Sequence, residues 1–428
     1  MDAAGSFFPD GAVALADGRI LALGDRRTVT ATVNAATMVD ACGKAILPGF
    51  VNCHGHAGLA LLRGLAEEFP LQRWLNNTIW PVMKHAEPED TYAGARLACL
   101  EMIRAGITTF TDMWRDLPAT VQAVEESGLR ARLAFNMRDF SDPARLETEW
   151  NSGFEAIDGR HPTSLICYGL APHSLYACSN ELLRRCADRV EKLGCHLQIH
   201  IAETEREVVE CRAKNGRTPV EQLDEFGLLG PQTLMAHGVW LNDADCRRAA
   251  KAGASVSHNI TSNLKLASGV APLTRFQAAA LNVALGTDSA ASNNVLDPFR
   301  EMKYAALLQR SVQEDPTLWP ARAILEAATR NGARALGLEE EVGSLEVGKR
   351  ADLILIDLDK PHFAPARRDD AQALAALIVF AATAADVDTS IVEGRVLMRN
   401  REVMSLDLQA VCEAAQTASR GLLSRAGV

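Results

Sequence analysis

The feature that most constrains the fold is an alternation of apolar, strand-like runs with segments of helical periodicity, repeated eight times from residue 47 onward. Helix candidates between the runs include residues 88–106 and residues 179–194, which offer Ser179 or Asn180 as an N-cap and end on Gly194. Eight such alternations predict a (β/α)8 barrel. The eight strand-like runs cover residues 47–54, 106–113, 129–137, 165–173, 195–203, 233–241, 254–260 and 281–288.

The two ends of the chain follow a different pattern. Residues 11–26 contain two short strand-like runs joined by Asp-Gly, which is a hairpin signal. After residues 320–338, where we expect a helix beginning with Pro320, short strand-like runs and tight turns return. Neither end can bury its own apolar face. We therefore expect residues 1–46 and 345–428, the latter with a terminal helix, to form one composite β-sandwich beside a barrel of residues 47–344.

Composition limits the partners of this 428-residue chain. The formal net charge is −10, and no dense run of Lys or Arg offers a phosphate-binding surface, so nucleic acid is not an expected partner. No basic and apolar leader and no run of about 18 apolar residues is present, so we expect neither export nor a membrane span. The ten cysteines show no C-x-x-C spacing, which favours a reduced, cytoplasmic location.

Polar residues gather where the predicted strands end, which is where barrel enzymes carry their chemistry. His54 and His56 are separated by one glycine, so both imidazoles would project from the same face of a strand. Scattered surface histidines would not be distributed in this way. The strand-end residues are His54, His56, Asp112, His173, His200, His237, His258 and Asp288.

Three of these histidines and one aspartate form a candidate metal site. Imidazole nitrogen and carboxylate oxygen suit Zn²⁺, with Fe²⁺ and Mn²⁺ as alternatives, and such a set leaves a position open for water. The run at 165–173 has no lysine that could be carbamylated to bridge two metals, so we expect a single divalent ion. The alternative is that these are solvated loop or hydrogen-bonded core histidines. The predicted ligands are His54, His56, His200 and Asp288.

Further strand-end residues are candidates for catalysis and substrate binding. Glu203 follows His200 by three residues, so its carboxylate could reach a water at the metal or a substrate nitrogen. His237 is the candidate to orient that water, and His173 to contact substrate. His258 could shape the pocket, and Asp112 could support the ligands from behind. Each of these residues could instead be a core histidine or a solvated carboxylate.

Aromatic residues offer a surface for a flat heterocycle. Trp74, Trp80 and Trp114 could stack on such a ring, although large aromatic side chains more often belong to the core. Ser289, which follows Asp288 in a loop of small polar residues, is more typical of a turn than of a participant in the chemistry.

Several motifs together resemble the amidohydrolase superfamily. They are "PGFVNCHGH", "HIAETE", "AHG", "SNLKLASGVAP", "GTDSAASNN" and "GSLEVGKRADLILID". Within that superfamily the chain resembles the branch of methylthioadenosine/S-adenosylhomocysteine deaminases and s-triazine hydrolases. The resemblance covers nearly the whole chain and implies a barrel with a β-sandwich built from both termini. It also implies a homodimer.

The resemblance implies the same roles for the site residues. His54, His56, His200 and Asp288 match the metal ligands of the family. Glu203 corresponds to the proton shuttle, His237 to the residue that orients the hydrolytic water, and His173 to a substrate contact. One position departs from the pattern: Met83 in "WPVMK" stands where nucleoside-acting relatives often carry a glutamate that binds ribose hydroxyls.

We expect a metal-dependent hydrolytic deaminase of an aminated N-heterocycle, foremost an adenosine-type nucleoside. In this hypothesis the metal activates water, Asp288 accepts its proton, Glu203 protonates the ring nitrogen and His237 holds the developing oxyanion. Hydrolysis of a free heterocycle such as guanine, a pterin or an s-triazine, with an amine or chloride leaving, uses the same water and remains an alternative. A catalytically silent barrel that only binds ligands is a remote one.

Overall fold

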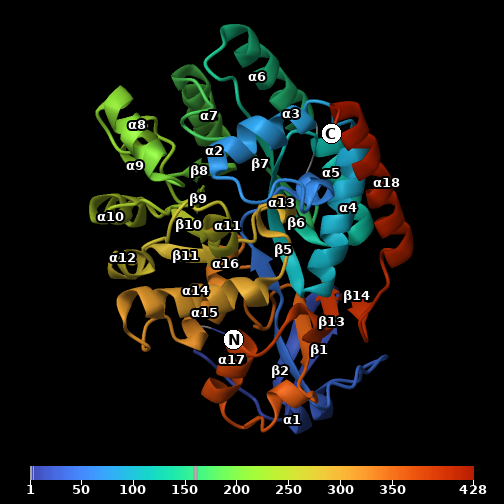
Figure 1. Cartoon of the computed structure of the whole chain (residues 1–428). Helices are drawn as coiled ribbons and strands as arrows, with labels where there is room; N and C mark the ends of the chain where they lie inside the picture. The colour runs from blue at the N-terminus through green and yellow to red at the C-terminus, as the bar shows by residue number, and fades with distance from the viewer. Residues whose placement is uncertain (1, 3, 158–159, 161) are drawn as a thin grey trace.

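The computed structural model describes residue 2 and residues 4–157, 160 and 162–428, and it contains an eight-stranded parallel sheet rolled into a barrel (Figure 1). Strands β4 to β11 pair in sequence order, each parallel to the next. The predicted (β/α)8 fold is therefore confirmed. The barrel strands are β4 (Phe50–Asn52), β5 (Ile107–Trp114), β6 (Arg130–Met137), β7 (Ile166–Pro172), β8 (His196–Ile201), β9 (Thr233–His237), β10 (Ser255–His258) and β11 (Asn282–Leu285).

The first and last barrel strands meet and close the ring. The amide of Cys53 donates to the carbonyl of Leu285 (2.9 Å), and the amide of Asp288 donates to the carbonyl of His54 (3.0 Å). A Cβ on Gly286 would lie 2.5 Å from the side-chain oxygens of Ser257 and Asn259 and 2.9 Å from the Cβ of His54. Only glycine fits at that position, and the junction brings a predicted ligand from each strand together.

Helices surround the barrel and cover the ends of its strands. Predicted helix 179–194 is confirmed in detail: the hydroxyl of Ser179 caps it and Gly194 ends it with φ of 60°. None of the described helices combines the length and apolar character needed to cross a bilayer. Those packed around the barrel include α4 (Pro88–Arg104), α5 (Leu117–Ser127), α6 (Pro143–Ile157), α7 (Asn180–Leu193), α8 (Glu205–Asn215), α9 (Pro219–Glu225), α10 (Asp243–Ala252), α12 (Leu273–Ala278) and α14 (Pro298–Gln313).

Short helices lie over the carboxyl end of the barrel, where the loops that follow the strands meet. They help to enclose the space above the strand ends, and four of them lie between His56 and α4 along the chain. These elements are the 3-10 helix η1 (Ala57–Leu62), α2 (Leu71–Trp74), the π-helical turn η2 (Leu75–Ile79), α3 (Trp80–Met83), α11 (Ile260–Lys265) and α13 (Ala290–Asn293).

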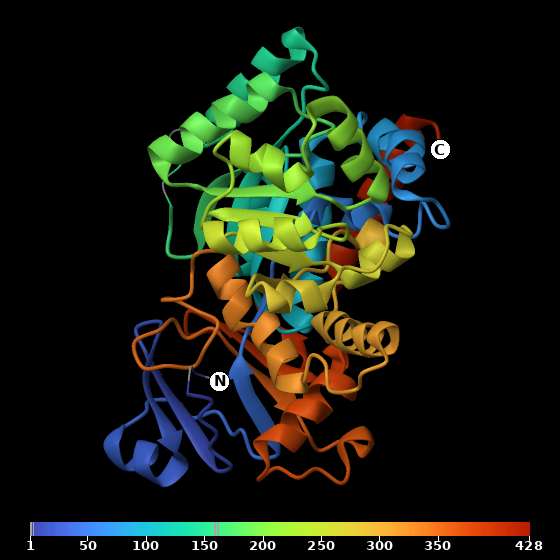
Figure 2. The same ribbon diagram turned by 90° about the vertical axis from the view of Figure 1, so that its left-hand side faces the viewer.

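A second β-structure combines both ends of the chain, as predicted (Figures 1 and 2). A hairpin of β1 (Gly11–Ala16) and β2 (Arg19–Asp25) turns at Asp17 and Gly18 and packs its Ile20 on a five-stranded sheet. That sheet has the order β15-β14-β13-β12-β3. Its strands are β3 (Lys44–Pro48), β12 (Leu353–Asp357), β13 (Val387–Val392), β14 (Arg395–Arg399) and β15 (Glu402–Val403).

The boundaries of two elements differ from the sequence-based expectations. Residues 47–48 do not start the barrel, because they pair with β12 in the second sheet and the chain enters the barrel only at Phe50. The helix expected over residues 320–338 is two helices, α15 (Ala321–Ala327) and α16 (Arg330–Ala335). The carbonyl of Ala328, between the two helices, accepts a hydrogen bond from the amide of Val51 in barrel strand β4 (2.8 Å). This carbonyl is therefore not used to continue the helix.

The terminal helix lies against the barrel and not in the sandwich. Helix α18 (Leu408–Ala426) runs beside α4 (Figure 1), and Arg425 forms an ion pair with Asp90 at the start of that helix. The hydroxyl of Ser419 donates to the carbonyl of Leu61 in η1 (2.8 Å). The remaining helical elements belong to the two ends of the chain. They are α1 (Arg26–Thr32), the short turns η3 (Pro361–Phe363) and η4 (Ala384–Asp386), and α17 (Ala371–Phe380).

Candidate active site

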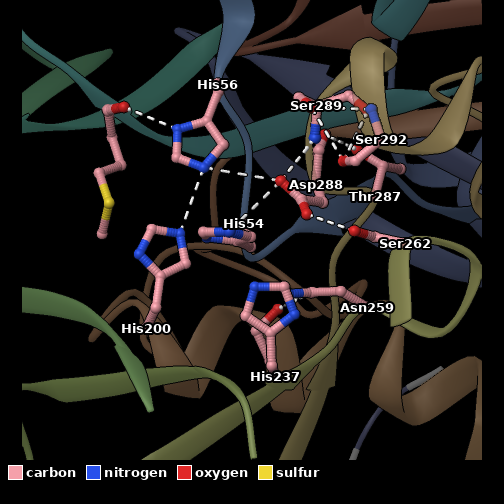
Figure 3. A network of polar contacts seen from close by, with 12 residues as sticks. His54, His56, His200, His237, Asn259, Ser262, Thr287, Asp288, Ser289 and Ser292 are labelled. Carbon is pink, nitrogen blue, oxygen red and sulfur yellow. Dashed lines mark hydrogen bonds and ion pairs between the residues drawn. The ribbon is translucent and has the colours of Figure 1, made fainter. Parts of the chain in front are cut away.

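The predicted ligands meet at the carboxyl end of the barrel (Figure 3). His54 and His56 follow β4, His200 is in β8, and Asp288 follows β11. His54 Nε2 lies 3.5 Å and His56 Nε2 lies 3.6 Å from Asp288 Oδ1. His200 Nε2 lies 3.3 Å from His56 Nε2. Four side chains that are distant in the sequence therefore point their donor atoms at one small space.

The far side of each imidazole ring is held by an acceptor. Nδ1 of His54 lies 2.7 Å from Oε1 of Gln198, Nδ1 of His56 lies 2.9 Å from a backbone carbonyl, and Nδ1 of His200 lies 2.6 Å from another. Each Nδ1 therefore carries the proton, and each Nε2 presents a lone pair to the shared space. The two carbonyls belong to Met113 and His173.

The electrostatics of the site favour the forms that bind metal. Burial lowers the pKa of His54 to about 3, although Asp288 opposes the shift. Burial also lowers the pKa of His56, and it holds the pKa of His200 well below its ordinary value. The imidazoles are thus neutral at physiological pH. Burial raises the pKa of Asp288, but the histidines His54, His56 and His237 outweigh it and the net pKa is lowered.

Asp288 is fixed by its neighbours. The hydroxyl of Ser262, in α11, donates to Oδ2 (2.6 Å), and the amide of Ser289 donates to Oδ1 (2.7 Å). The backbone of Asp288 has φ of 58°, a left-handed conformation that an aspartate adopts only where its surroundings require it. The carboxylate therefore has little freedom to turn away from the histidines.

This set fits a divalent ion of the zinc type. The ligand atoms of His54, His56 and His200 lie within 4.8 Å of one another, as do those of His54, His237 and Asp288. Nε2 of His54 is fully buried and has no hydrogen-bond partner among the described residues. A buried nitrogen of this kind needs a ligand, and nitrogen and carboxylate donors are those that Zn²⁺ takes.

Glu203 and His237 lie together beside the ligands. Oε2 of Glu203 lies 3.9 Å from Nε2 of His237, whose Nδ1 is 2.8 Å from Oδ1 of Asn263. Burial raises the pKa of the Glu203 carboxyl. Burial opposes a charge on His237, but Glu203 and Asp288 together raise its pKa above the ordinary value. Glu203 and His237 can therefore share a proton, as acid–base chemistry requires.

A polar and aromatic wall adjoins the ligands at His173. The ring of His173 lies 4.5 Å from the ring of His200 and 5.9 Å from the ring of Trp80, between centroids. Trp80 also contacts Phe140 edge-to-face at 5.2 Å, and the guanidinium of Arg138 lies 5.2 Å from its ring centroid. The structure therefore places His173 and Trp80 next to the candidate metal site.

The other aromatic candidates lie in different surroundings. Trp74 is buried in an apolar cluster with Leu75 and Ile79, against which the half-buried side chain of Met83 packs. Trp114 is 6.4 Å from His56 between ring centroids, and its Nε1 donates to the hydroxyl of Thr91 in α4 (3.2 Å). The structure does not bring Trp74 to the ligands, because its side chain is part of the core.

Two strand-end residues lie behind the site. Asp112 is buried and accepts a hydrogen bond from the amide of Ala57 (2.7 Å), so it supports the turn that carries His56. Burial raises the pKa of Asp112 to about 7. His258 is also fully buried, burial lowers its pKa to about 3, and neither ring nitrogen has a partner among the described residues.

Sequence reasoning missed the residues that orient the ligands. Gln198 stands two residues before His200 on the same strand, and this period-two spacing is a signal that could have identified it. Ser262 and Asn263 belong to the "SNLKLASGVAP" motif but act on residues from other elements. Their roles depend on how α11 is folded over the barrel, which no local pattern reveals.

The fold and the site define an amidohydrolase. Residues 45–397 match the model of the Amidohydrolase family, and the chain belongs to this metal-dependent family.

Named relatives extend over the whole chain. A 5'-deoxyadenosine deaminase of Methanothermobacter thermautotrophicus is 43% identical over 414 residues, covering 96% of this chain and 95% of the relative. A 5-methylthioadenosine/S-adenosylhomocysteine deaminase of Desulforudis audaxviator is 43% identical over 422 residues, covering 98% and 96%. The crystal structure of an adenosine deaminase from Xanthomonas campestris with bound zinc is similar with a TM-score of 0.92 and 32% identity, covering 97% and 94%.

Proposed function

We propose that this protein is a metal-dependent hydrolase that deaminates an adenosine-type nucleoside and releases ammonia. The observation that carries the proposal is the juxtaposition of two groups: the convergent donors of His54, His56, His200 and Asp288, and the buried Glu203–His237 pair beside them. The full-length similarity to deaminases of 5'-deoxyadenosine and methylthioadenosine supports the substrate class. We further propose zinc as the metal and the cytoplasm as the compartment, the latter in keeping with ten free cysteines.

The four ligands would hold one divalent ion. When bound, such an ion acts as a Lewis acid that lowers the pKa of water toward neutrality. The contribution of the protein is to keep the three imidazoles neutral and correctly oriented, which it does through burial and through the Nδ1 hydrogen bonds.

Asp288 is the group that accepts the proton of the attacking water. Its Oδ2 accepts one hydrogen bond, from the hydroxyl of Ser262, and its Oδ1 accepts one from the amide of Ser289 and faces His54 and His56. Each oxygen keeps a second lone pair, so the carboxylate is held beside the ligands with capacity to take a proton. The water oxygen then forms a bond to the ring carbon that carries the amino group. His237, whose ring is held through Asn263, orients this oxygen and stabilises the charge that develops on it.

Glu203 supplies a proton to the neighbouring ring nitrogen. Burial raises its pKa, so the carboxyl retains a proton more readily than an exposed glutamate would. Protonation of the ring nitrogen lets the ring accept the electron pair as the water adds. The proton held by Asp288 passes to the amino group, the carbon–nitrogen bond breaks and ammonia leaves. The second proton of the water leaves the new hydroxyl group as the carbonyl forms, and it restores the proton that Glu203 gave to the ring nitrogen.

Met83 favours a second candidate function, hydrolysis of a free heterocycle such as guanine, a pterin or an s-triazine. The side chain of Met83 is half-buried against an apolar cluster and offers no hydrogen bond to a sugar hydroxyl. The nucleoside proposal therefore requires that the ribose be bound by other residues. The two candidates would use the same ligands and the same water, and they differ in the leaving group and in what occupies the space beside Trp80.

Isotope labelling tests the proposed reaction. We expect the zinc-loaded protein, incubated with 5'-methylthioadenosine in water enriched in oxygen-18, to produce ammonia and an equal amount of a 6-oxo nucleoside that contains the heavy oxygen. The control is the Asp288→Asn variant under the same conditions, which should give neither product. Release of the free base, or a product without the label, would contradict hydrolytic deamination of the nucleoside.

A further inference from the structure

Glu207 is a buried carboxylate with an unusual set of partners. It lies in the first turn of α8 and is 5% exposed. Its Oε1 accepts a hydrogen bond from the amide of Ala202 (2.9 Å), and its Oε2 accepts one from the amide of Glu203 (3.0 Å). Among the described residues no Lys or Arg forms an ion pair with it. Both hydrogen bonds of the Glu207 carboxylate therefore come from two consecutive backbone amides.

This arrangement departs from what the local sequence would form by default. "TERE" at residues 204–207 has the spacing of a capping box, in which the third helical residue binds the amide of the N-cap, here Thr204. The hydroxyl of Thr204 does cap the helix, since it accepts from the amide of Glu207 (3.3 Å). The Glu207 carboxylate, however, reaches past Thr204 to the turn that carries Glu203.

That turn is strained and is joined to the turn that carries His237. Ala202 has φ of 50°, a left-handed conformation that alanine disfavours. On its other side, the carbonyl of Ala202 accepts from the amide of Trp240 (2.9 Å), and the carbonyl of Ile201 accepts from the amide of Gly238 (3.0 Å). The separation of Glu203 from His237 therefore depends on how this turn is held.

We propose that Glu207 is a positioning residue: its carboxylate clamps the left-handed turn at Ala202 and thereby aims Glu203 at His237 and at the substrate. The inference rests on the proposed function for the role of Glu203. A carboxylate is needed because two adjacent amides require two acceptor oxygens on one side chain. Glutamine offers one oxygen, and its NH2 group would face the second amide, donor to donor.

The clamp also explains why a carboxyl group is buried here. Taking a carboxylate out of water without a cationic partner costs stability, so such a group is retained only where its hydrogen bonds do something that an apolar side chain cannot. Two backbone amides beside a catalytic glutamate meet that description. Glu207 touches neither the ligands nor the substrate space in the described contacts, so it acts through Glu203.

The first test measures backbone amide exchange, which needs no substrate. In the wild-type protein the amides of residues 202 and 203 should be protected from hydrogen exchange, and Glu207→Gln should increase their exchange. Glu205→Gln is the matched control, because Glu205 lies in the same helical turn and is exposed. Rapid exchange of these amides in the wild-type protein would overturn the proposal even if the Glu207 variant failed to fold.

The second test separates positioning from general stability. On a substrate that the wild-type protein deaminates, Glu207→Gln should lower kcat by about tenfold or more and change KM by less than about threefold, while the bound metal is unchanged. Added to a Glu203→Gln variant, the same substitution should lower the residual kcat by less than about threefold. Equal losses in both backgrounds, or wild-type kcat in Glu207→Gln, would overturn the proposal.

The two tests distinguish failure of this inference from failure of the proposed function. Protected amides in a protein that deaminates no nucleoside would overturn the proposed reaction and leave the clamp in place. Active deamination with unprotected amides, or with a fully active Glu207→Gln variant, would overturn the clamp and leave the reaction in place.

Discussion

His54 and Asp288 are joined twice, once through the backbone and once through their side chains. The amide of Asp288 donates to the carbonyl of His54 (3.0 Å), and Oδ1 of Asp288 lies 3.5 Å from Nε2 of His54. The first contact closes the barrel between its first and last strands, and the second forms the centre of the candidate metal site. The strand junction that closes the barrel therefore also places these two ligands beside each other.

Loss of Asp288 should abolish turnover. We expect Asp288→Asn to lower kcat by about a hundredfold or more, because the amide cannot accept a proton, and to weaken metal binding. Steady-state kinetics and metal analysis of the purified protein measure both effects. His362→Asn is the control, because His362 is partly exposed and lies in the second β-structure. Near wild-type kcat in Asp288→Asn would contradict the assigned role.

Glu203 should be needed for turnover but not for metal binding. Glu203→Gln keeps the shape of the side chain and removes the proton donor, so kcat should fall by about a hundredfold to ten-thousandfold with the metal content unchanged. We expect kcat of the wild-type protein to fall at alkaline pH as Glu203 loses its proton, and this fall should be absent from the residual activity of the variant. An unchanged pH profile would show that a different group titrates.

Breaking a buried ion pair between the barrel and the second sheet should lower stability. Arg130 in β6 and Asp352 beside β12 pair through Nε and Oδ2 at 2.8 Å, and both side chains are nearly inaccessible. We expect Asp352→Asn to lower the free energy of unfolding by about 3 kcal/mol, since it leaves a buried guanidinium uncompensated. Urea denaturation measures this change.

An exposed ion pair is the control for that measurement. Arg206 and Glu210 pair at 2.6 Å on α8, but both side chains are more than half exposed. Glu210→Gln should therefore change the free energy of unfolding by less than about 1 kcal/mol. Equal effects of Asp352→Asn and Glu210→Gln would show that burial of the first pair is unimportant for stability.

Glu301 should make stability depend on pH. Burial raises its pKa from 4.5 to about 7, against hydrogen bonds donated by Thr261 and Asn293. The folded protein therefore holds a proton that the unfolded chain has released. This contribution to stability is complete below the unfolded pKa and is lost as the pH rises through about 7.

A comparison with Glu301→Gln isolates this contribution. The free energy of unfolding of the wild-type protein, minus that of the variant, should fall by up to about 3 kcal/mol between about pH 5 and about pH 8. Denaturant titrations at several pH values measure the difference, and other titrating groups largely cancel in it. A difference that stays constant, or that rises with pH, would contradict the raised pKa.

The sequence predicted the barrel well because its buried parallel strands are apolar runs with clear ends. The strand predicted at 233–241 is too long, because β9 ends at His237, where the chain turns with φ of 75°. The apolar Val239 and Leu241 continue the strand-like pattern beyond that turn. Helices α15 and α16 were predicted as one helix, because the hydrogen bond from Val51 that separates them comes from a strand distant in the sequence. Both differences have tertiary causes that a local pattern does not contain.

The candidate site was predictable to the same extent. His54, His56, His200 and Asp288 were identifiable because each stands at the end of a predicted strand, and the fold brings strand ends together. The groups that orient these residues were not identifiable in this way. Glu207, for example, appears in the sequence as a capping-box residue, and only the structure shows it bound to two amides of the preceding turn.

The most direct test of nucleoside deamination is a comparison of kcat/KM values, measured by ammonia release, for the zinc-loaded wild-type protein. The substrates are 5'-methylthioadenosine, 5'-deoxyadenosine and S-adenosylhomocysteine, beside free adenine, guanine, a pterin and an aminotriazine. We predict that kcat/KM for at least one nucleoside exceeds that for every free heterocycle by about a hundredfold or more, which corresponds to specific recognition of the sugar. Turnover confined to a free heterocycle would contradict it and would assign the space beside Met83 and Trp80 to another substrate.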